Sequence, residues 1–320
     1  MGEQGAMIVF HRSANWWPYC KAQLVELQER HEELREQGLG VVAISYDSEE
    51  VLAAFAERKS IATLPLLSDD DSSVIRRFGI YNTVAEEGVG PNADNADVKA
   101  DVEKYVSVFG AGQAIVGTPY PGTFIVDRQG RVTARFFEEF YRERNTAANI
   151  MLKLGSPVSP ISGMRGDTPY LSIGAYQSNS TITVGSRFHL GIEIEPKTDI
   201  HVYAPGAQEL GYRVIELSLE VPDFIQTLPV VYPSSEIYHF EPLDEHVPVY
   251  LKPFNLVQEV VVGGSSAASE TLAGLDVVTL TGRLDYQACD DEVCFSPTSI
   301  PLTWTLTVDP LDRQRVATPE

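Results

Sequence analysis

Residues 10–24 read FHRSANWWPYCKAQL and connect a short apolar run to a long periodic one. The apolar run, residues 6–10, has the length and composition of a buried β-strand. Leu24, Leu27, His31 and Leu34 then mark one face at spacings of three and four residues, which is the pattern of an amphipathic helix. Pro18 suits the first turn of that helix. The stretch therefore predicts a strand, a sharp turn and a helix with Cys20 near its N-terminus.

The alternation of strands and helices continues to about residue 154. Further strands are expected at residues 41–46 and 63–67 and on both sides of a turn at 127–130, and helices are expected at 18–37, 48–59, 69–78 and up to about 154. This order predicts an α/β layer with parallel strand pairs. Residues 84–112, rich in Gly, Asn, Asp and Ala, predict a mobile insertion or a long loop.

Residues 155–169 are predicted to be a linker, because their prolines and glycines interrupt both helices and strands. The sequence pattern changes after them. Beyond the linker the apolar runs are short, several of them alternate, and turn signals separate them, as is typical of an all-β sandwich. The sequence thus predicts a first domain at residues 1–154, a β-sandwich at 170–310 and a frayed polar tail at 311–320.

Composition narrows the class of protein. A chain of 320 residues is longer than most single domains with one hydrophobic core, which agrees with two domains. The net charge of −21 argues against nucleic-acid and anionic-membrane partners, and no apolar run approaches the ~18 residues that cross a bilayer. Met1 leads into the first strand without a secretory signal, and the localisation stays open: periplasmic or extracytoplasmic if an upstream signal peptide is missing from this chain, otherwise cytoplasmic.

Cys20 lies where the free amide groups and dipole of a helix N-terminus favour the reactive thiolate. Three interpretations stay open for it: a packed structural thiol, a monothiol with peroxidase-like chemistry, and a thiol that pairs with an external thiol. Arg12 near the turn is a possible stabiliser of the thiolate, although an ordinary surface arginine is the simpler interpretation. Trp17 and Tyr19 are expected to pack around the turn rather than to form a ligand box.

Residues 10–24, the strand–helix series after them and residues 121–127, PGTFIVD, resemble the thioredoxin-like redoxins of the alkyl hydroperoxide reductase/thiol-specific antioxidant (AhpC/TSA) family. The resemblance covers about residues 5–154. It implies a thioredoxin-like α/β fold that lacks the first β-strand region of the family. It also implies that Pro119 or Pro121 occupies the place of the cis-proline that commonly lies beside the active-site cysteine.

Two departures from the active-site patterns concern Trp17. Thioredoxin-type reductases use Cys-x-x-Cys, and the matching tetrad here is Trp17-Pro18-Tyr19-Cys20, with tryptophan in the attacking position. Peroxiredoxins place Thr or Ser three residues before the reactive cysteine and Pro seven before it; Trp17 and Ser13 occupy these positions here. Neither active-site pattern is complete.

Cys289 and Cys294 are separated by four residues in a predicted loop between the β-runs 277–286 and 300–308. Such spacing can close a small disulfide ring, either inert or redox-active. Zinc is the competing interpretation, but it needs about four ligands and no second cysteine pair is present. We therefore expect no metal and no cofactor, and we favour a redox-active pair.

Residues 286–297, YQACDDEVCFSP, and residues 199–206, DIHVYAPG, resemble the N-terminal periplasmic domain of the thiol:disulfide interchange proteins of the DsbD family. The resemblance covers about residues 170–309 and implies an immunoglobulin-like sandwich that takes electrons from a thioredoxin-like partner and passes them to oxidised client proteins through mixed disulfides. It implies that Cys294 faces the partner, that Cys289 resolves the mixed disulfide, and that Tyr203 or a neighbour shields the pair. The cysteine spacing is one residue shorter than usual in that family.

These resemblances together predict an oxidoreductase for disulfide exchange or antioxidant defence, with peroxide reduction at Cys20 as the second enzymatic option. The alternative is a degenerate redoxin that serves as a non-catalytic binding or adaptor module in a thiol relay. No phosphate loop, dinucleotide glycine motif or nucleophile elbow is present in the sequence.

Overall fold

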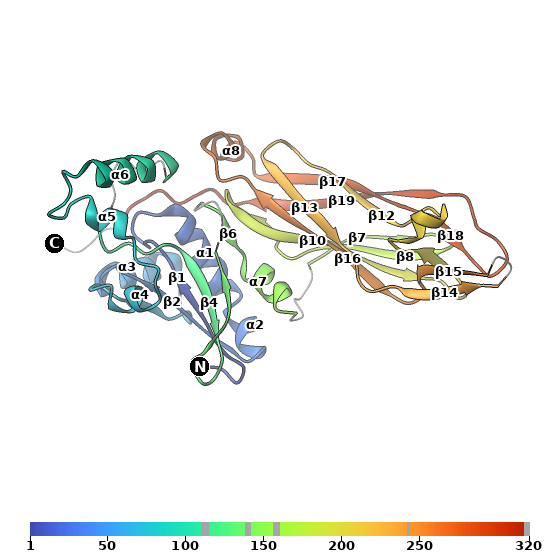
Figure 1. Cartoon of the computed structure of the whole chain (residues 1–320), viewed down its shortest axis with the longest axis horizontal. Coiled ribbons are helices and arrows are strands. Elements are labelled where there is room, and N and C mark those ends of the chain that lie inside the picture. Colours follow the sequence, from blue (N-terminus) through green and yellow to red (C-terminus); the bar gives the residue numbers. More distant parts are fainter. Residues whose placement is uncertain (110–114, 138–141, 156–160, 242–243, 317–320) are drawn as a thin grey trace. The chain divides into compact units, whose positions relative to one another are not determined.

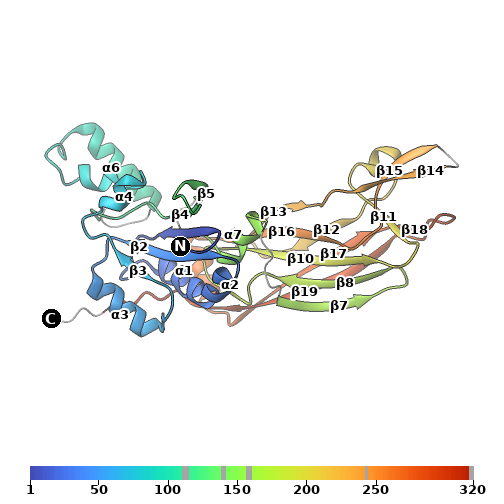
Figure 2. The same ribbon diagram turned by 90° about the horizontal axis from the view of Figure 1, so that it is seen from below.

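The chain forms two compact units, which Figures 1 and 2 show as ribbons. The computed structural model describes residues 1–109, 115–137, 142–155, 161–241 and 244–316. Unit 1 comprises Met1–Ile150 with Leu311–Glu320, and unit 2 comprises Met151–Pro310. Within the described ranges no helix has both the length and the apolar character needed to cross a bilayer.

The sheet of unit 1 has five strands in the order β3-β2-β1-β4-β5 (Figures 1 and 2). The strands are β1 (Gly5–Phe10), β2 (Leu39–Ser45), β3 (Leu66–Ser68), β4 (Gly122–Val126) and β5 (Val132–Phe136). β1, β2 and β3 are parallel, as the alternation predicts, whereas β4 and β5 run antiparallel to their neighbours. Phe10 on β1 and Phe124 on β4 pack edge to face in the core, so the end of β1 is firmly held before the turn to Cys20.

The helices of unit 1 are α1 (Pro18–Glu29), α2 (His31–Glu36), α3 (Glu49–Lys59), α4 (Ser73–Arg77), α5 (Thr83–Glu87) and α6 (Ala96–Phe109). The single helix predicted at residues 18–37 is divided at Arg30, whose backbone leaves helical angles at φ −98° and ψ 4°. The Arg30 side chain forms ion pairs with Glu26 on one side of the break and Glu33 on the other, which stabilises the junction.

The prediction of a long loop at residues 84–112 is wrong for most of that range. Asn82 caps α5, because its side chain accepts a hydrogen bond from the amide of Ala85, and α6 follows after a short connection. Tyr105 on α6 is 5% exposed, so this helix packs on the unit rather than standing away from it. Gly, Asn and Asp concentrate in the connection between the two helices; residues 110–114 lie outside the described residues.

Unit 2 consists largely of β-strands in three sheets (Figure 2). The first sheet has the order β13-β16-β10-β8-β7, the second β14-β15-β11-β18 and the third β12-β17-β19-β9. Their bounds are β7 (Ile161–Asp167), β8 (Leu171–Gln177), β9 (Thr181–Ile182), β10 (Ser186–Pro196), β11 (His201–Tyr203), β12 (Glu216–Glu220), β13 (Ile225–Val231), β14 (Glu236–Phe240), β15 (Glu245–Tyr250), β16 (Phe254–Val262), β17 (Val277–Tyr286), β18 (Ala288–Cys289) and β19 (Thr298–Val308). The immunoglobulin-like form of this unit stays a prediction.

Unit 2 departs from the predicted pattern in two places. The range predicted as a linker contains β7, which pairs with β8 through Asp167 and Ser172; residues 156–160 of that range lie outside the described residues. A helix, α8 (Ser266–Leu272), interrupts the strands, and Ser265 caps it by accepting from the amide of Ala268. A serine cap before a short run of alanines was the available signal for this helix.

Residues 311–316, for which the sequence predicts a frayed tail, pack within unit 1. Lys21, 1% exposed, donates to the carbonyl of Gln314, and Arg58 forms an ion pair with Asp312 at 2.8 Å. The amide of Val316 donates to the side chain of Asn15 at 3.0 Å. A buried ammonium needs acceptors, and this segment supplies one. Residues 317–320 lie outside the described residues.

Candidate functional sites

Cys20 is the third residue of α1 and is fully buried. Pro18 occupies the first turn, where its missing amide hydrogen costs nothing, and Trp17 is the N-cap residue. The Cys20 sulfur accepts hydrogen bonds from the amide of Arg12 at 3.3 Å and from the guanidinium of Arg144 at 3.5 Å. Two N–H donors, one of them cationic, therefore converge on this sulfur.

Arg12 is 3% exposed, so its interpretation as an ordinary surface arginine is wrong. Its guanidinium donates to the hydroxyl of Tyr105 at 2.8 Å and lies 4.6 Å from the centre of the Trp17 ring. The Trp17 and Tyr19 rings are 5.5 Å apart, as expected of side chains that pack around the turn. Arg12 thus contributes its backbone amide to Cys20 while its side chain ties the turn to α6.

Asp47 fixes the turn between β1 and α1. Its carboxylate accepts from the hydroxyls of Ser13 at 2.7 Å and Ser45 at 2.9 Å, and from the amide of Ala14 at 2.7 Å. Burial raises the pKa of Asp47, while the hydrogen bonds from Ala14, Ser13 and Ser45 oppose that rise. The turn that carries the Arg12 amide toward Cys20 is therefore anchored to the end of β2.

Arg144, in β6 (Arg144–Asn145), lies 124 residues beyond Cys20 in the sequence. It lines a cavity of about 20 Å³, room for about one water molecule, together with Gln23 and Pro121 among others. Pro121 thus lines the same cavity as Arg144, the residue that donates to the Cys20 sulfur. No described peptide bond is cis, so neither Pro119 nor Pro121 is a cis-proline. No local motif marks Arg144, so sequence reasoning missed it.

His11 is a fully buried histidine at the start of the same turn. Burial, and secondarily the nearby charge of Arg144, lower the pKa of His11 to about 3. Neither ring nitrogen has a hydrogen-bond partner among the described residues. The imidazole is therefore neutral at ordinary pH.

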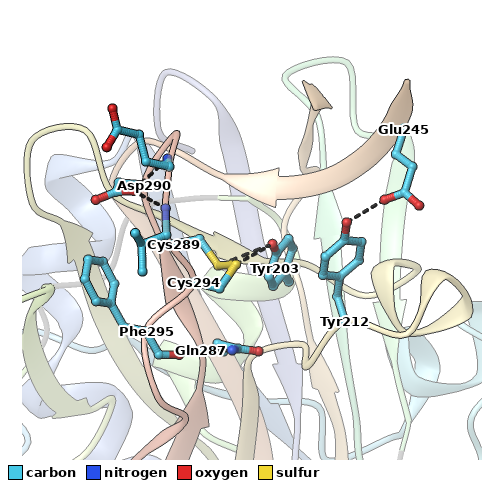
Figure 3. The surroundings of a disulfide bond; sticks show 10 residues. Tyr203, Tyr212, Glu245, Gln287, Cys289, Asp290, Cys294 and Phe295 are labelled. Atoms are coloured by element: carbon cyan, nitrogen blue, oxygen red, sulfur yellow. Dashed lines mark hydrogen bonds between the residues drawn. A yellow bond between two sulfur atoms is a disulfide. The ribbon is translucent and has the colours of Figure 1, made fainter. Parts of the chain in front are cut away.

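Cys289 and Cys294 form a disulfide in unit 2, shown in Figure 3. Cys289 is the last residue of β18, pairs in register with His201 on β11, and is 1% exposed. Cys294 lies in the loop that follows and is exposed to solvent. Cys294 is therefore the more solvent-accessible of the two cysteines.

The loop between the two cysteines is a compact turn. The Asp290 side chain accepts from the amides of Glu292 at 2.8 Å and Val293 at 2.6 Å, and these two bonds lower the pKa of the Asp290 carboxyl. The Asp290 amide donates to the Val293 carbonyl at 3.0 Å. Beyond the pair, the Phe295 amide donates to the carbonyl of Ala288. These hydrogen bonds fold the four residues between the cysteines into a turn that keeps Cys294 next to Cys289.

Tyr203 on β11 points at the disulfide, with its hydroxyl 3.2 Å from the Cys294 sulfur and 3.3 Å from the Cys289 sulfur (Figure 3). The Tyr203 ring stacks on Tyr212 at 4.4 Å between ring centres, and the Tyr212 hydroxyl donates to Glu245 at 2.5 Å. On the other side His201 stacks on Tyr238, whose hydroxyl donates to Asp291 at 2.8 Å. The sequence singled out Tyr203, but no local signal identified these other partners.

The described side chains include no group of three His, Cys, Asp or Glu residues placed as metal ligands. The structure also separates the three cysteines by unit: Cys20 is in unit 1, and Cys289 and Cys294 are in unit 2. Two chemically distinct thiol sites are therefore present on one chain.

Residues 2–135 match the AhpC/TSA family. Unit 1 thus holds a thioredoxin-like redoxin domain, which confirms that part of the prediction. Peroxiredoxin Bcp of Escherichia coli is 36% identical over 78 residues, which cover 24% of this chain and 49% of that protein. A putative peroxiredoxin of Mycobacterium tuberculosis is 36% identical over 75 residues, covering 23% and 47%. The chain therefore spans about half the length of the curated relatives that it matches.

Two solved structures give lower similarity. Peroxidoxin BcpB of Mycobacterium tuberculosis is 20% identical with a TM-score of 0.32, covering 44% of this chain and 71% of that one. The N-terminal periplasmic domain of ScsB from Proteus mirabilis is 18% identical with a TM-score of 0.33, covering 45% and 51%.

Proposed function

We propose that this chain is a thiol–disulfide oxidoreductase whose exchangeable pair is Cys289 and Cys294. The observation that carries the proposal is the asymmetry of this disulfide, with Cys294 exposed and Cys289 1% exposed beneath it. Exchange proceeds when a thiolate attacks the accessible sulfur and the other sulfur leaves. Cys294 then carries the mixed disulfide, and the second thiol of the dithiol partner completes the reduction of the pair. The reduced Cys294 attacks an oxidised client, and Cys289 resolves that second mixed disulfide.

The partner of this proposed exchange is a thioredoxin-like protein, and the recipient is an oxidised client. This follows from the resemblance of residues 170–309 to the N-terminal domain of the DsbD family, in which an immunoglobulin-like sandwich relays electrons. The residues around the pair support the same assignment, because Tyr203 covers both sulfurs while Cys294 stays open to solvent.

The test is exchange with purified thioredoxin in wild type and in three variants, Cys20→Ser, Cys289→Ser and Cys294→Ser. We expect wild type and Cys20→Ser to exchange with reduced thioredoxin, and Cys289→Ser and Cys294→Ser to be inactive because neither can form the pair. Reduced Cys289→Ser should form a stable mixed disulfide through Cys294 with a thioredoxin that lacks its second cysteine and whose remaining sulfur is activated as the thionitrobenzoate disulfide, and thionitrobenzoate is the leaving group. A wild-type protein that exchanges with neither thioredoxin nor an insulin substrate overturns the proposal and favours the non-catalytic adaptor.

A second function, peroxide reduction at Cys20, is favoured by the two N–H donors to its sulfur and by the AhpC/TSA match. In this step the Cys20 thiolate attacks one peroxide oxygen, the O–O bond breaks, and sulfenic acid and hydroxide form. The small cavity beside Arg144 suits hydrogen peroxide better than a bulky alkyl hydroperoxide. With the disulfide intact, hydrogen peroxide should consume one thiol in wild type, and the rate of peroxide loss should fall in Cys20→Ser. An equal rate of peroxide loss in the two proteins contradicts this function.

A further inference from the structure

The Tyr203 hydroxyl is shared between the two sulfurs of the disulfide. It lies 3.2 Å from the Cys294 sulfur and 3.3 Å from the Cys289 sulfur (Figure 3). Disulfide sulfurs carry no hydrogen, so the hydroxyl is the donor in both contacts. Because the two distances are nearly equal, the hydroxyl can follow negative charge from one sulfur to the other without a change of side-chain position.

Tyr203 is held rigidly in that place. It is 5% exposed and packs in a cluster with Ala207, Val247 and Cys289. Tyr212 stacks on its outer face. A donor whose position is fixed before the reaction needs no reorganisation when charge develops on its acceptor.

The Tyr203 phenol also keeps its proton. Burial, reinforced by Tyr238 and by the negative charge of Glu245, raises the pKa of Tyr203 to about 12. Across the pH range in which thiols ionise, the hydroxyl therefore remains a donor and does not become a competing anion.

The carboxylates and the burial around the two cysteines disfavour a thiolate, and a hydrogen-bond donor counteracts both. The carboxylates of Asp290 and Asp291 lie in the same loop as Cys294, and both act on the neighbouring His201 as negative charges. Negative charge close by opposes the formation of a thiolate, and so does the burial of Cys289. A hydrogen bond to the leaving sulfur offsets both effects.

We propose that Tyr203 is a catalytic residue of disulfide exchange in unit 2, donating its hydroxyl hydrogen bond to whichever sulfur carries the negative charge. The proposal rests on the function proposed above. A partner thiolate attacks the Cys294 sulfur and forms a new S–S bond, while the Cys289–Cys294 bond breaks and its electron pair stays on Cys289. Tyr203 stabilises that thiolate without transferring its proton. In the second step the second thiolate of the dithiol partner attacks the partner's own sulfur in the mixed disulfide, forms the partner's disulfide, and releases Cys294 as a thiolate. With an oxidised client, the Cys294 thiolate attacks the client disulfide, and the Cys289 thiolate then attacks Cys294 and expels the client as a thiolate.

If Tyr203 only shielded the disulfide, it would do so with its ring, and phenylalanine at this position would shield the disulfide equally well. The test is therefore Tyr203→Phe, which keeps the ring and removes the hydroxyl. The matched control is Tyr250→Phe on β15, because Tyr250 is 4% exposed and its hydroxyl donates to the carbonyl of Pro233 instead of a sulfur. Both variants are made in a Cys20→Ser background, and circular dichroism checks that both fold.

Two readouts are measured: the rate of disulfide reduction by dithiothreitol across pH, and the titration of the reduced thiols by thiolate absorbance. Loss of a hydrogen bond to a charged sulfur should slow reduction about 10-fold and raise the lower thiol pKa by about one unit in Tyr203→Phe. Tyr250→Phe should stay within about twofold of the parent. Unchanged rate and titration in Tyr203→Phe overturn the proposal.

Failure of the proposed function gives a different result. If the parent protein is reduced by dithiothreitol but exchanges with no thioredoxin-like protein, the relay function fails. The thiolate titration still decides whether Tyr203 acts as donor, because it needs no protein partner.

Discussion

Cys289 and Cys294 are joined by one disulfide but differ in access, since 1% of Cys289 is exposed whereas Cys294 is open to solvent. Once reduced, the two thiols should therefore react at different rates with a reagent from solution. In a Cys20→Ser background, Cys289→Ser leaves only Cys294, which should react with Ellman's reagent at least about 10-fold faster than the Cys289 left by Cys294→Ser. Equal rates would show that the loop opens on reduction and would remove the basis for assigning Cys294 as the attacked sulfur.

The negative charges around the disulfide predict selectivity among small thiols. Asp291 accepts from Tyr238 and Glu245 accepts from Tyr212, so carboxylates lie on two sides of the pair. Cationic cysteamine should reduce the disulfide about 3- to 10-fold faster than anionic mercaptoethanesulfonate at low salt, with the difference shrinking at about 0.5 M salt.

Asp291→Asn should narrow that difference between the two thiols. The control is Asp276→Asn, because Asp276 is exposed and lies just before the start of β17, at the opposite end of that strand from Tyr286. No dependence on thiol charge, or an equal effect of the two substitutions, would contradict a local acidic field.

Arg144 predicts the reactivity of Cys20. Because its guanidinium donates to the Cys20 sulfur at 3.5 Å, Arg144→Met should slow alkylation of Cys20 by iodoacetamide about 10-fold. The control is Arg135→Met on β5, where the arginine is exposed. The rate is followed by mass spectrometry of the Cys20 peptide. A variant that reacts as fast as wild type would show that the Arg12 amide suffices.

Local periodicity predicted the parts of the fold that depend on neighbouring residues. The strand predicted at residues 277–286 coincides with β17, and the α/β order of unit 1 follows the alternation of apolar runs. Contacts between distant residues were not predictable in this way. Arg144 donates a hydrogen bond to Cys20, 124 residues away in the sequence. Tyr105 accepts one from Arg12 and belongs to α6, a helix that was not predicted because its surroundings are rich in Gly and Asn. Tertiary packing brings such pairs together, and neither the periodicity nor the motif spacing of the sequence carries information about it.

His11 predicts a pH dependence of the stability of unit 1. Burial and Arg144 lower the pKa of His11 to about 3 in the folded protein, against 6.5 for an ordinary histidine. Between these values the unfolded chain binds a proton that the folded chain does not, so stability is present above pH 6.5 and is lost as pH falls toward 3. The loss should approach about 1.4 kcal/mol per pH unit for this one group.

Substituting His11 should remove that contribution to the slope. The variants His11→Phe and His11→Asn differ in packing and polarity, but neither binds a proton in this range. Urea unfolding of unit 1, followed between about pH 7 and pH 5, should give the same flattened pH dependence for both, whatever their stability at neutral pH. The opposing outcome is a wild-type slope in both variants, which would mean that His11 becomes exposed or gains a partner before the unit unfolds.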